Sequence, residues 1–248
     1  MSAPLHAAIP ACKEAASIGR VIQSVLSLFP GAGIIVVDDG SVDGTGTAAL
    51  HAGAKVVRMP FISGYGVALQ TGLRWAAQHG ARCVVTLDAD GRHDPRELSA
   101  IMEPVLSGRA DIAIGSRDLA GGAPCQAPLA RRLGAWACAR LVSALTRRRI
   151  TGATSGFQCL NAVAIRLYAD LEDFPEIAPD ADMLLYAHLR GLRICKVPVS
   201  MYADEGQESI RGLLRSFFYV PLGGHPGSAA CLLGASSGIL HPLKGKQV

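Results

Sequence analysis

Short apolar runs and helix-like repeats alternate along the first 120 residues of the chain. Short, mostly hydrophobic runs predict buried strands, and apolar positions that recur every three or four residues predict amphipathic helices. The expected strands are 7–11, 34–37, 55–59, 83–87 and 112–114, and the expected helices are 17–28, 43–52, 64–79 and 95–107. Repeated strand–helix–strand units are typical of an α/β fold with a mostly parallel central sheet and helices on both faces.

The helix expected at 95–107 has the clearest start signal. Asp94 stands at the N-cap position, Pro95 takes the first helical position and Glu97 the third, which is close to a capping box. Further along, the expected elements are a basic helix at 130–149, a strand at 154–161, a helix at 180–190 and a strand at 193–199. The segment 221–248 is rich in Gly, Ser and Ala without a regular period, so we expect a poorly ordered tail.

Composition narrows the class of protein. Half of the 248 residues are hydrophobic, which is enough for a sizeable core, and the net charge of +4 is too small to argue for a nucleic-acid partner. No apolar run reaches the roughly 18 residues of a membrane span, and the N-terminus lacks a basic signal-peptide region. The seven cysteines form no C-x-x-C pair. We therefore expect reduced thiols and a cytoplasmic protein.

Two of the expected strands end in carboxylates. The run at 83–87 leads into Asp88 and Asp90, and the run at 34–37 leads into Asp38 and Asp39. Ligands of parallel α/β sheets bind beyond the carboxyl ends of the strands, so these acids predict a nucleotide site there. Asp88 and Asp90 are hard oxygen ligands that suit Mg2+ or Mn2+ bound together with a diphosphate. The competing interpretation of either pair is a solvated turn, because Asp favours turns.

The glycine patterns do not fit other nucleotide folds. The stretch Gly44-Thr45-Gly46-Thr47-Ala48-Ala49 resembles a dinucleotide fingerprint, but acid and not glycine ends the preceding strand. A Walker A sequence is absent from the chain. Both alternatives are therefore disfavoured.

An ordered set of short motifs resembles family 2 glycosyltransferases, and among them the dolichyl- or polyprenyl-phosphate sugar transferases. The motifs are Ile9-Pro10-Ala11, Val37-Asp38-Asp39-Gly40-Ser41, Gly64-Tyr65-Gly66, Thr86-Leu87-Asp88-Ala89-Asp90-Gly91, His93-Asp94-Pro95 and Ile114-Gly115-Ser116-Arg117. The resemblance covers residues from about 5 to 200. It implies a GT-A fold, a nucleotide-sugar donor, a divalent metal and an inverting transfer.

On the donor side, the resemblance assigns roles by position in the motifs. It implies that the nucleobase pocket is lined by Pro10, Ala11 and Glu14, and that the base and ribose are contacted by Asp38 and Asp39. It implies that Asp90 is catalytic because it ligates the metal. It also implies that Asp88 contacts the ribose or acts as a further metal ligand.

On the acceptor side, the resemblance assigns a second group of residues. It implies that Arg117 steadies phosphate, that Arg131 faces the acceptor phosphate, and that 154–157 is a strand near the acceptor. Asp180 and Asp182 match an acidic pair beside the reaction centre. Arg117, Asp180 and Asp182 are therefore expected to be catalytic, and one of the two acids would be the base if the acceptor were a hydroxyl.

The chain departs from the family pattern at two informative places. Cys12 and Lys13 replace the usual Tyr-Asn, which removes an aromatic surface that can stack on the base. Arg92 replaces a common Gln, and its guanidinium cannot ligate a metal and would repel one. We hypothesise that Arg92 supplies part of the metal's charge to the diphosphate. His93 is expected to orient the loop rather than bind metal.

Together these patterns predict a glycosyltransferase domain over 1–220, with a donor half at 1–120 and an acceptor half at 121–220. The expected reaction moves a sugar from a UDP- or GDP-sugar to an anionic or hydroxyl acceptor, with polyprenyl phosphate as the leading candidate. Six arginines without an acid, within 124–149, predict peripheral contact with the inner face of the membrane, against the alternative of a solvated basic face. A non-catalytic nucleotide-sugar-binding homologue stays an alternative. A sugar nucleotidyltransferase is disfavoured because its glycine-rich opening is absent.

Overall fold

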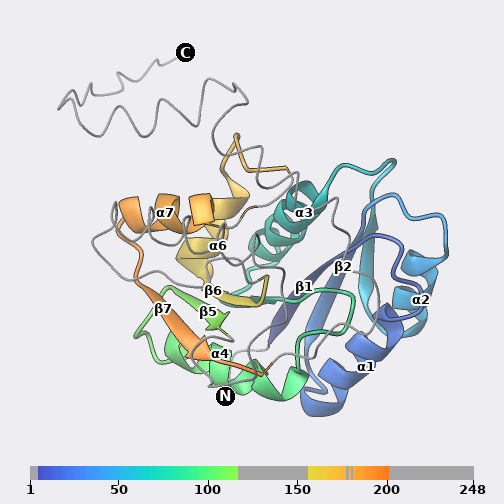
Figure 1. The fold of residues 1–248 in the computed structure, drawn as a ribbon, viewed down its shortest axis with the longest axis horizontal. Helices are drawn as coiled ribbons and strands as arrows, with labels where there is room; N and C mark the ends of the chain where they lie inside the picture. The colour runs from blue at the N-terminus through green and yellow to red at the C-terminus, as the bar shows by residue number, and fades with distance from the viewer. Residues whose placement is uncertain (1–4, 117–155, 177–178, 180, 201–248) are drawn as a thin grey trace, which may run out of the picture. The chain divides into compact units, whose positions relative to one another are not determined.

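A seven-stranded sheet forms the centre of the protein in the computed structural model, which describes residues 5–116, 156–176, 179 and 181–200 (Figure 1). The strands are β1 (His6–Ala11), β2 (Gly33–Asp38), β3 (Lys55–Arg58), β4 (Cys83–Thr86), β5 (Ile112–Ser116), β6 (Gln158–Asn161) and β7 (Ile194–Pro198). Their order is β3-β2-β1-β4-β6-β5-β7. Only β6 among these strands runs against its neighbours, β4 and β5. The mostly parallel sheet predicted from the sequence is thus confirmed.

Helices cover both faces of this sheet (Figure 1). One face carries α1 (Ile18–Leu28), α2 (Thr45–His51) and α4 (Leu98–Leu106), which follows a short 3-10 turn at Pro95–Glu97. The other face carries α3 (Tyr65–Gln78), α6 (Ala162–Ala169) and α7 (Ala181–Leu189). All described residues fall within one compact unit, Met1–Glu208.

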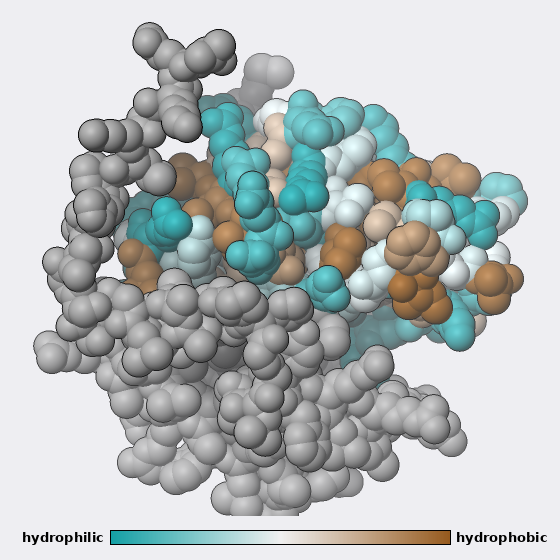
Figure 2. All heavy atoms as spheres, turned by 90° about the horizontal axis from the view of Figure 1, so that it is seen from above, coloured by the Kyte–Doolittle hydropathy of each residue, from teal (hydrophilic) through white to brown (hydrophobic). Residues whose placement is uncertain are grey.

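The core is divided between the two faces because side chains alternate along each strand. In β2, Ile34 and Val36 pack in the core on the α1 side, whereas Ile35 and Val37 pack in the core on the α3 side. A strand buried on both faces must be apolar at nearly every position. This explains why the strands read as continuous hydrophobic runs. On the outside, the surface seen from above mixes polar and hydrophobic patches (Figure 2).

Two expectations for the fold need correction. The strand expected at 154–161 is limited to Gln158–Asn161 within the described residues, and α6, which follows it at once, was not expected. Asn161 allows the helix to start directly after the strand, because its Oδ1 accepts hydrogen bonds from the N–H groups of Val163 (3.0 Å) and Ala164 (2.9 Å).

The predicted N-cap at Asp94 is confirmed, since its Oδ1 accepts from the Arg96 N–H at 3.0 Å.

A polar cluster at the N-terminal starts of the parallel strands β5 and β7 offers a test of the fold. Asp111 accepts from the backbone N–H (2.8 Å) and Nε (3.0 Å) of Arg193 through Oδ2, and from Arg193 Nη2 (2.9 Å) and Asn161 Nδ2 (2.8 Å) through Oδ1. These contacts, chiefly the hydrogen bonds from Arg193, lower the pKa of the Asp111 carboxyl below its ordinary value of 3.8.

We expect Asp111→Asn to lower the free energy of unfolding at neutral pH by about 1 kcal/mol, a small figure because Arg193 is largely exposed. Because the pKa of Asp111 is lower in the folded state than in the unfolded state, the ionised carboxyl stabilises the fold at pH values above the unfolded-state pKa. This stabilisation disappears as the pH falls through the folded-state pKa. The urea midpoints of the parent and the variant should therefore converge as the pH falls below 3.8. A difference that stays constant from pH 7 to pH 3 would contradict this assignment.

Candidate active site

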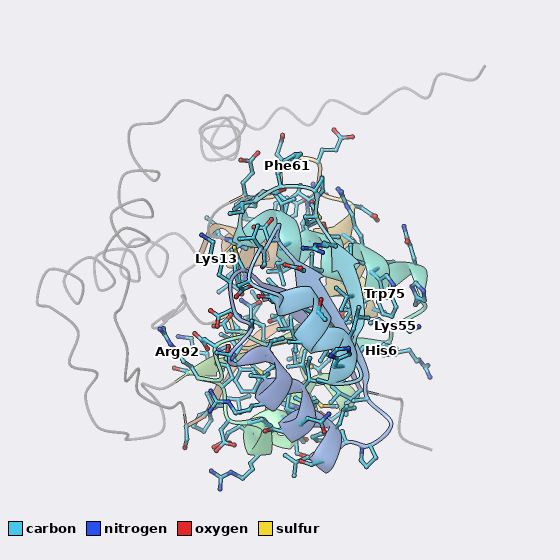
Figure 3. All side chains as sticks on the ribbon, turned by 90° about the vertical axis from the view of Figure 1, so that its right-hand side faces the viewer. His6, Lys13, Lys55, Phe61, Trp75 and Arg92 are labelled. Atoms are coloured by element: carbon cyan, nitrogen blue, oxygen red, sulfur yellow. The ribbon has the colours of Figure 1, made fainter. Side chains whose placement is uncertain are left out.

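The carboxyl ends of β1, β2 and β4 meet at one edge of the sheet. Ala11 pairs with Asp38 in register, and the Asp39 N–H donates to the Ala11 carbonyl at 2.8 Å. Asp88 follows the end of β4, which lies parallel to β1 on its other side. Figure 3 shows Lys13 and Arg92 on this side of the molecule, with His6, at the start of β1, on the opposite side. The structure thus brings the two predicted acidic strand ends to one edge.

The loop after β1 is tied to the loop after β2. The Lys13 N–H donates to Ser41 Oγ at 3.0 Å and the Glu14 N–H donates to Thr45 Oγ1 at 2.9 Å. Lys13 takes a left-handed conformation with φ of 60°, which is uncommon for a residue with a side chain. Pro10 and Ala11 are buried, and Glu14 accepts from the Ser17 hydroxyl at 2.6 Å. Of the residues expected at the nucleobase, Pro10 and Ala11 therefore form the end of β1, and Glu14 lies in the fixed turn that follows it.

Asp38 is fully buried below this turn. Its Oδ1 accepts from the Ser41 N–H at 3.0 Å, and its Oδ2 lies 3.6 Å from Arg58 Nε. Within the described residues, Oδ2 is buried without a hydrogen bond. A Cβ added to Gly46 would lie 2.6 Å from this oxygen, so a larger residue there would require the Asp38 carboxylate to shift. The carboxylate supports the turn from inside the protein.

Asp39 holds the loop that leads into α3. Its two oxygens accept from the N–H groups of Ser63 (2.6 Å) and Gly64 (2.9 Å). Gly40 has φ of +65°, and a Cβ there would lie 2.6 Å from the Phe61 carbonyl carbon. Phe61 itself is exposed and lies at the top of the view in Figure 3. Asp39 therefore connects the end of β2 to the start of α3.

Asp88 is oriented by two aromatic residues. Tyr65 Oη donates to Asp88 Oδ1 at 3.2 Å, and His93 Nε2 lies 3.4 Å from Asp88 Oδ2. The Asp88 N–H also donates to His93 Nδ1 at 3.1 Å, which places the imidazole proton on Nε2 in the neutral ring. His93 is buried and stacks on Phe157 with a centroid distance of 4.8 Å. These contacts give His93 the loop-orienting position that was expected for it.

Tyr65 is a site residue that the sequence analysis missed, since it appeared there only inside a motif. It stands between Gly64, which Asp39 holds, and Asp88, so it links the two acidic strand ends. A Cβ added to Gly156 would lie 2.8 Å from both Asp88 Oδ1 and Tyr65 Oη. In the sequence, the only signal for the contact between Tyr65 and Asp88 was the presence of glycines beside Tyr65 and in the segment 154–157.

Asp90 lies in the loop that follows β4, and its side chain is partly exposed. It lines an open hollow beside α1, together with Ser17, Arg20 and Ser24. Its side chain is 29% exposed, and its Oδ1 accepts from the Arg92 N–H at 2.9 Å. The Asp88 side chain is similarly 30% exposed. Hard carboxylate oxygens that keep this access fit a hydrated Mg2+ or Mn2+ ion.

A metal at this edge would need further ligands. In the part of the chain that the structure describes, no group of three or more His, Cys, Asp or Glu side chains gathers around a common point. Oxygens of a bound diphosphate are suitable ligands to complete the coordination. A metal held by Asp88 and Asp90 would therefore have to take its remaining ligands from elsewhere, such as a bound phosphate group.

Several expected site residues cannot be placed. Arg117, Arg131 and Asp180 lie outside the described residues, as does the basic segment 130–149. Asp182 lies in α7, but its side chain is likewise outside the description. Among the helices that are described, none has both the length and the apolar character needed to span a membrane.

Comparison with known proteins agrees with this geometry. The family model described as glycosyl transferase family 2 matches residues 7–167. An undecaprenyl-phosphate mannosyltransferase of Micrococcus luteus is 30% identical over 207 residues, which cover 81% of this chain and 84% of that protein. A polyprenol monophosphomannose synthase of Mycolicibacterium smegmatis is 38% identical over 120 residues, covering 46% of this chain and 45% of that protein.

The fold has solved counterparts. Glucosyl-3-phosphoglycerate synthase of Mycobacterium tuberculosis, in a crystal structure with Mn2+ and UDP-glucose, superposes with a TM-score of 0.61 at 22% sequence identity, covering 87% of this chain and 75% of that chain. The sheet and its helices form a GT-A fold, and the family match makes the chain a glycosyltransferase. The chain belongs to glycosyl transferase family 2.

Proposed function

We propose that this glycosyltransferase moves a sugar from a UDP- or GDP-sugar to polyprenyl phosphate, with a divalent metal and with inversion at the sugar. The observation that carries the proposal is the pair Asp88 and Asp90, held partly exposed at the carboxyl edge beside the buried acids Asp38 and Asp39. The names of the two bacterial relatives support a polyprenyl-phosphate acceptor. The crystal structure with Mn2+ and UDP-glucose supports the donor and the metal.

The donor side follows from the contacts of the acidic loop. Asp90 would hold Mg2+ or Mn2+, which as a Lewis acid would neutralise charge on the leaving diphosphate. Asp88, fixed by Tyr65 and His93, would accept from a ribose hydroxyl or assist at the metal. Asp38 and Asp39 would set the shape of the base and ribose pocket, together with Pro10, Ala11 and Glu14.

The transfer needs only one displacement. An oxygen of the acceptor phosphate forms a bond to the anomeric carbon while the bond from that carbon to the diphosphate breaks. The nucleoside diphosphate leaves with the electron pair, and the configuration inverts. Because a phosphate is already ionised near neutral pH, no strong base is required. We assign Arg117 and Arg131 to the phosphates, and Asp180 and Asp182 to the surroundings of the reacting carbon.

A direct assay tests the reaction and its acceptor class. The protein is incubated with labelled UDP-glucose or GDP-mannose, Mn2+ and one of three acceptors: polyprenyl phosphate, polyprenol without phosphate, or 3-phosphoglycerate. We expect label in the organic phase only with polyprenyl phosphate. Label on 3-phosphoglycerate would instead indicate a soluble phosphate acceptor. Absence of transfer to any of the three, in protein that is folded by circular dichroism, would contradict the proposal.

Tyr65→Phe tests the contact that orients Asp88. Loss of a hydrogen bond to a charged acceptor costs about 1.5 kcal/mol, which corresponds to roughly a tenfold fall in kcat/KM. The thermal midpoint should change little, because the ring keeps its packing. Tyr186→Phe in α7 is the matched control and should keep parental activity, since Tyr186 stacks with Arg190 through its ring. Equal activity of both variants would show that the hydroxyl is not needed.

We also propose that the segment 130–149 brings the enzyme to anionic lipid. Each basic residue near such a surface contributes about 1 kcal/mol, so replacing Arg147, Arg148 and Arg149 with Gln should strongly reduce co-sedimentation with anionic vesicles. Salt should weaken the parent's binding. Replacing the exposed Arg82, Arg166 and Arg190 removes the same charge elsewhere and should have a smaller effect. Equal losses in both triple variants would indicate a general charge effect.

A further inference from the structure

Arg92 lies on the carboxylate that is proposed to hold the metal. Its Nε is 3.0 Å from Asp90 Oδ2, and its backbone N–H donates to Asp90 Oδ1 at 2.9 Å. One residue thus contacts both oxygens of Asp90. The Arg92 side chain is 39% exposed, and Figure 3 shows it at the same side of the molecule as Lys13. The contact is therefore at the carboxyl edge, where Arg92 Nε is buried against Asp90 while the side chain as a whole stays partly exposed.

The local backbone produces this ion pair. Gly91, between the two residues, has φ of +83°, a conformation that turns the chain sharply and favours glycine. The turn brings the side chain of Arg92 back to the residue two positions before it. The ion pair therefore joins two residues that are only two positions apart along the chain.

A divalent ion and this guanidinium compete for the same oxygen. Mg2+ requires carboxylate oxygens at about 2.0–2.1 Å, and a cation already at Oδ2 repels a second one. Arg92 must therefore move away from Asp90 when a metal binds there.

A diphosphate provides the place to which Arg92 can move. Guanidinium groups bind phosphate oxygens well through paired N–H donors, and a diphosphate on the metal would lie within reach of a side chain that contacts a metal ligand. We propose that Arg92 is a resident counter-ion of Asp90, which weakens metal binding to the free enzyme and transfers to the donor diphosphate when metal and donor bind together. This inference rests on the proposed function, and it replaces the simpler hypothesis that Arg92 only substitutes for metal charge.

The consequence is a coupling between metal and donor. Mn2+ should bind weakly to the free protein and much more tightly with UDP or GDP present, because the nucleotide removes the competing cation. In Arg92→Gln the competition is absent. We expect this variant to bind Mn2+ alone about tenfold more tightly than the parent, and the coupling to nucleotide to shrink by about the same factor. Electron paramagnetic resonance of free Mn2+ measures both quantities without any catalytic turnover.

Arg96→Gln is a matched control. Arg96 also pairs with an acid two positions before it, with Nη2 at 2.7 Å from Asp94 Oδ2, and it belongs to the same loop region. Its removal should leave Mn2+ affinity unchanged. If Arg92→Gln binds Mn2+ no more tightly than the parent, the inference is wrong. If neither protein binds UDP or GDP in the presence of Mn2+, the proposed function fails, while the comparison of Mn2+ alone still decides the role of Arg92.

Discussion

Asp90→Asn should lower kcat/KM for sugar transfer by about 100-fold or more, because it removes the carboxylate that would hold the metal at the leaving diphosphate. The part of UDP or GDP affinity that depends on Mn2+ should disappear as well. The fold should survive, since Asp90 is partly exposed in a loop and its hydrogen bond to the Arg92 N–H can be made by an amide oxygen. Radiolabel transfer and calorimetry with and without chelator measure the two effects.

A control variant at another exposed aspartate separates the specific role of Asp90 from the effect of losing one negative charge. Asp170 is exposed at the end of α6, and Asp170→Asn removes the same charge far along the chain from the acidic loop. It should leave transfer and nucleotide binding at parental levels. If Asp90→Asn retains nucleotide affinity that is sensitive to chelator, another group holds the metal and the assignment of Asp90 is wrong.

Gly66→Ala should be strongly destabilising. A Cβ at this position would lie 1.7 Å from the Pro175 carbonyl oxygen and 2.9 Å from the Glu176 carbonyl, and the Gly66 N–H donates to the Glu176 oxygen at 2.7 Å. The clashing atoms are backbone, so the loop at 175–176 must separate from the start of α3. We expect a loss of about 3 kcal/mol and a fall in Tm of roughly 6–12 °C. Differential scanning fluorimetry measures the shift.

Gly19→Ala gives the control for this prediction. Gly19 lies in the first turn of α1 with no other atoms within 4 Å of an added Cβ. Alanine is the better helix former by about 1 kcal/mol, so this variant should be as stable as the parent or slightly more stable. A Tm for Gly66→Ala within 2 °C of the parent would show that the loop at 175–176 moves away at little cost.

Tyr65 connects the helix start at Gly66 with the acidic loop that contains Asp90. Gly66 fixes the start of α3 against the loop at 175–176, and Tyr65, its neighbour, donates to Asp88. Displacement of this helix end would therefore also misplace the acid that is proposed to contact the donor. We expect Gly66→Ala to lose activity even at temperatures where it remains folded.

Local patterns in the sequence were sufficient for most of the fold. Hydrophobic runs predicted β1, β2, β4 and β5 close to their observed bounds, because a strand buried on both faces is apolar at nearly every position. The bounds predicted for the more exposed strands β3 and β7 were also close to those observed. The N-cap at Asp94 was predicted because it depends on residues two or three positions apart. The helix α6 was missed, since Asn161 ends β6 and caps the helix without any loop between them.

The sequence by itself determined the α/β fold class, the family resemblance and the two acidic strand ends, since each depends on residues close together along the chain. Only the tertiary structure decided what those acids contact. Tyr65 hydrogen-bonds to Asp88, 23 positions away in the sequence, and Ser63 hydrogen-bonds to Asp39, 24 positions away. The packing of α3 on the sheet brings these residues together. Arg92 is close to Asp90 in sequence, yet its charge was expected on a diphosphate. The turn at Gly91 places it on the Asp90 carboxylate instead, because a glycine with positive φ reverses the chain and brings Arg92 back toward the residue two positions before it.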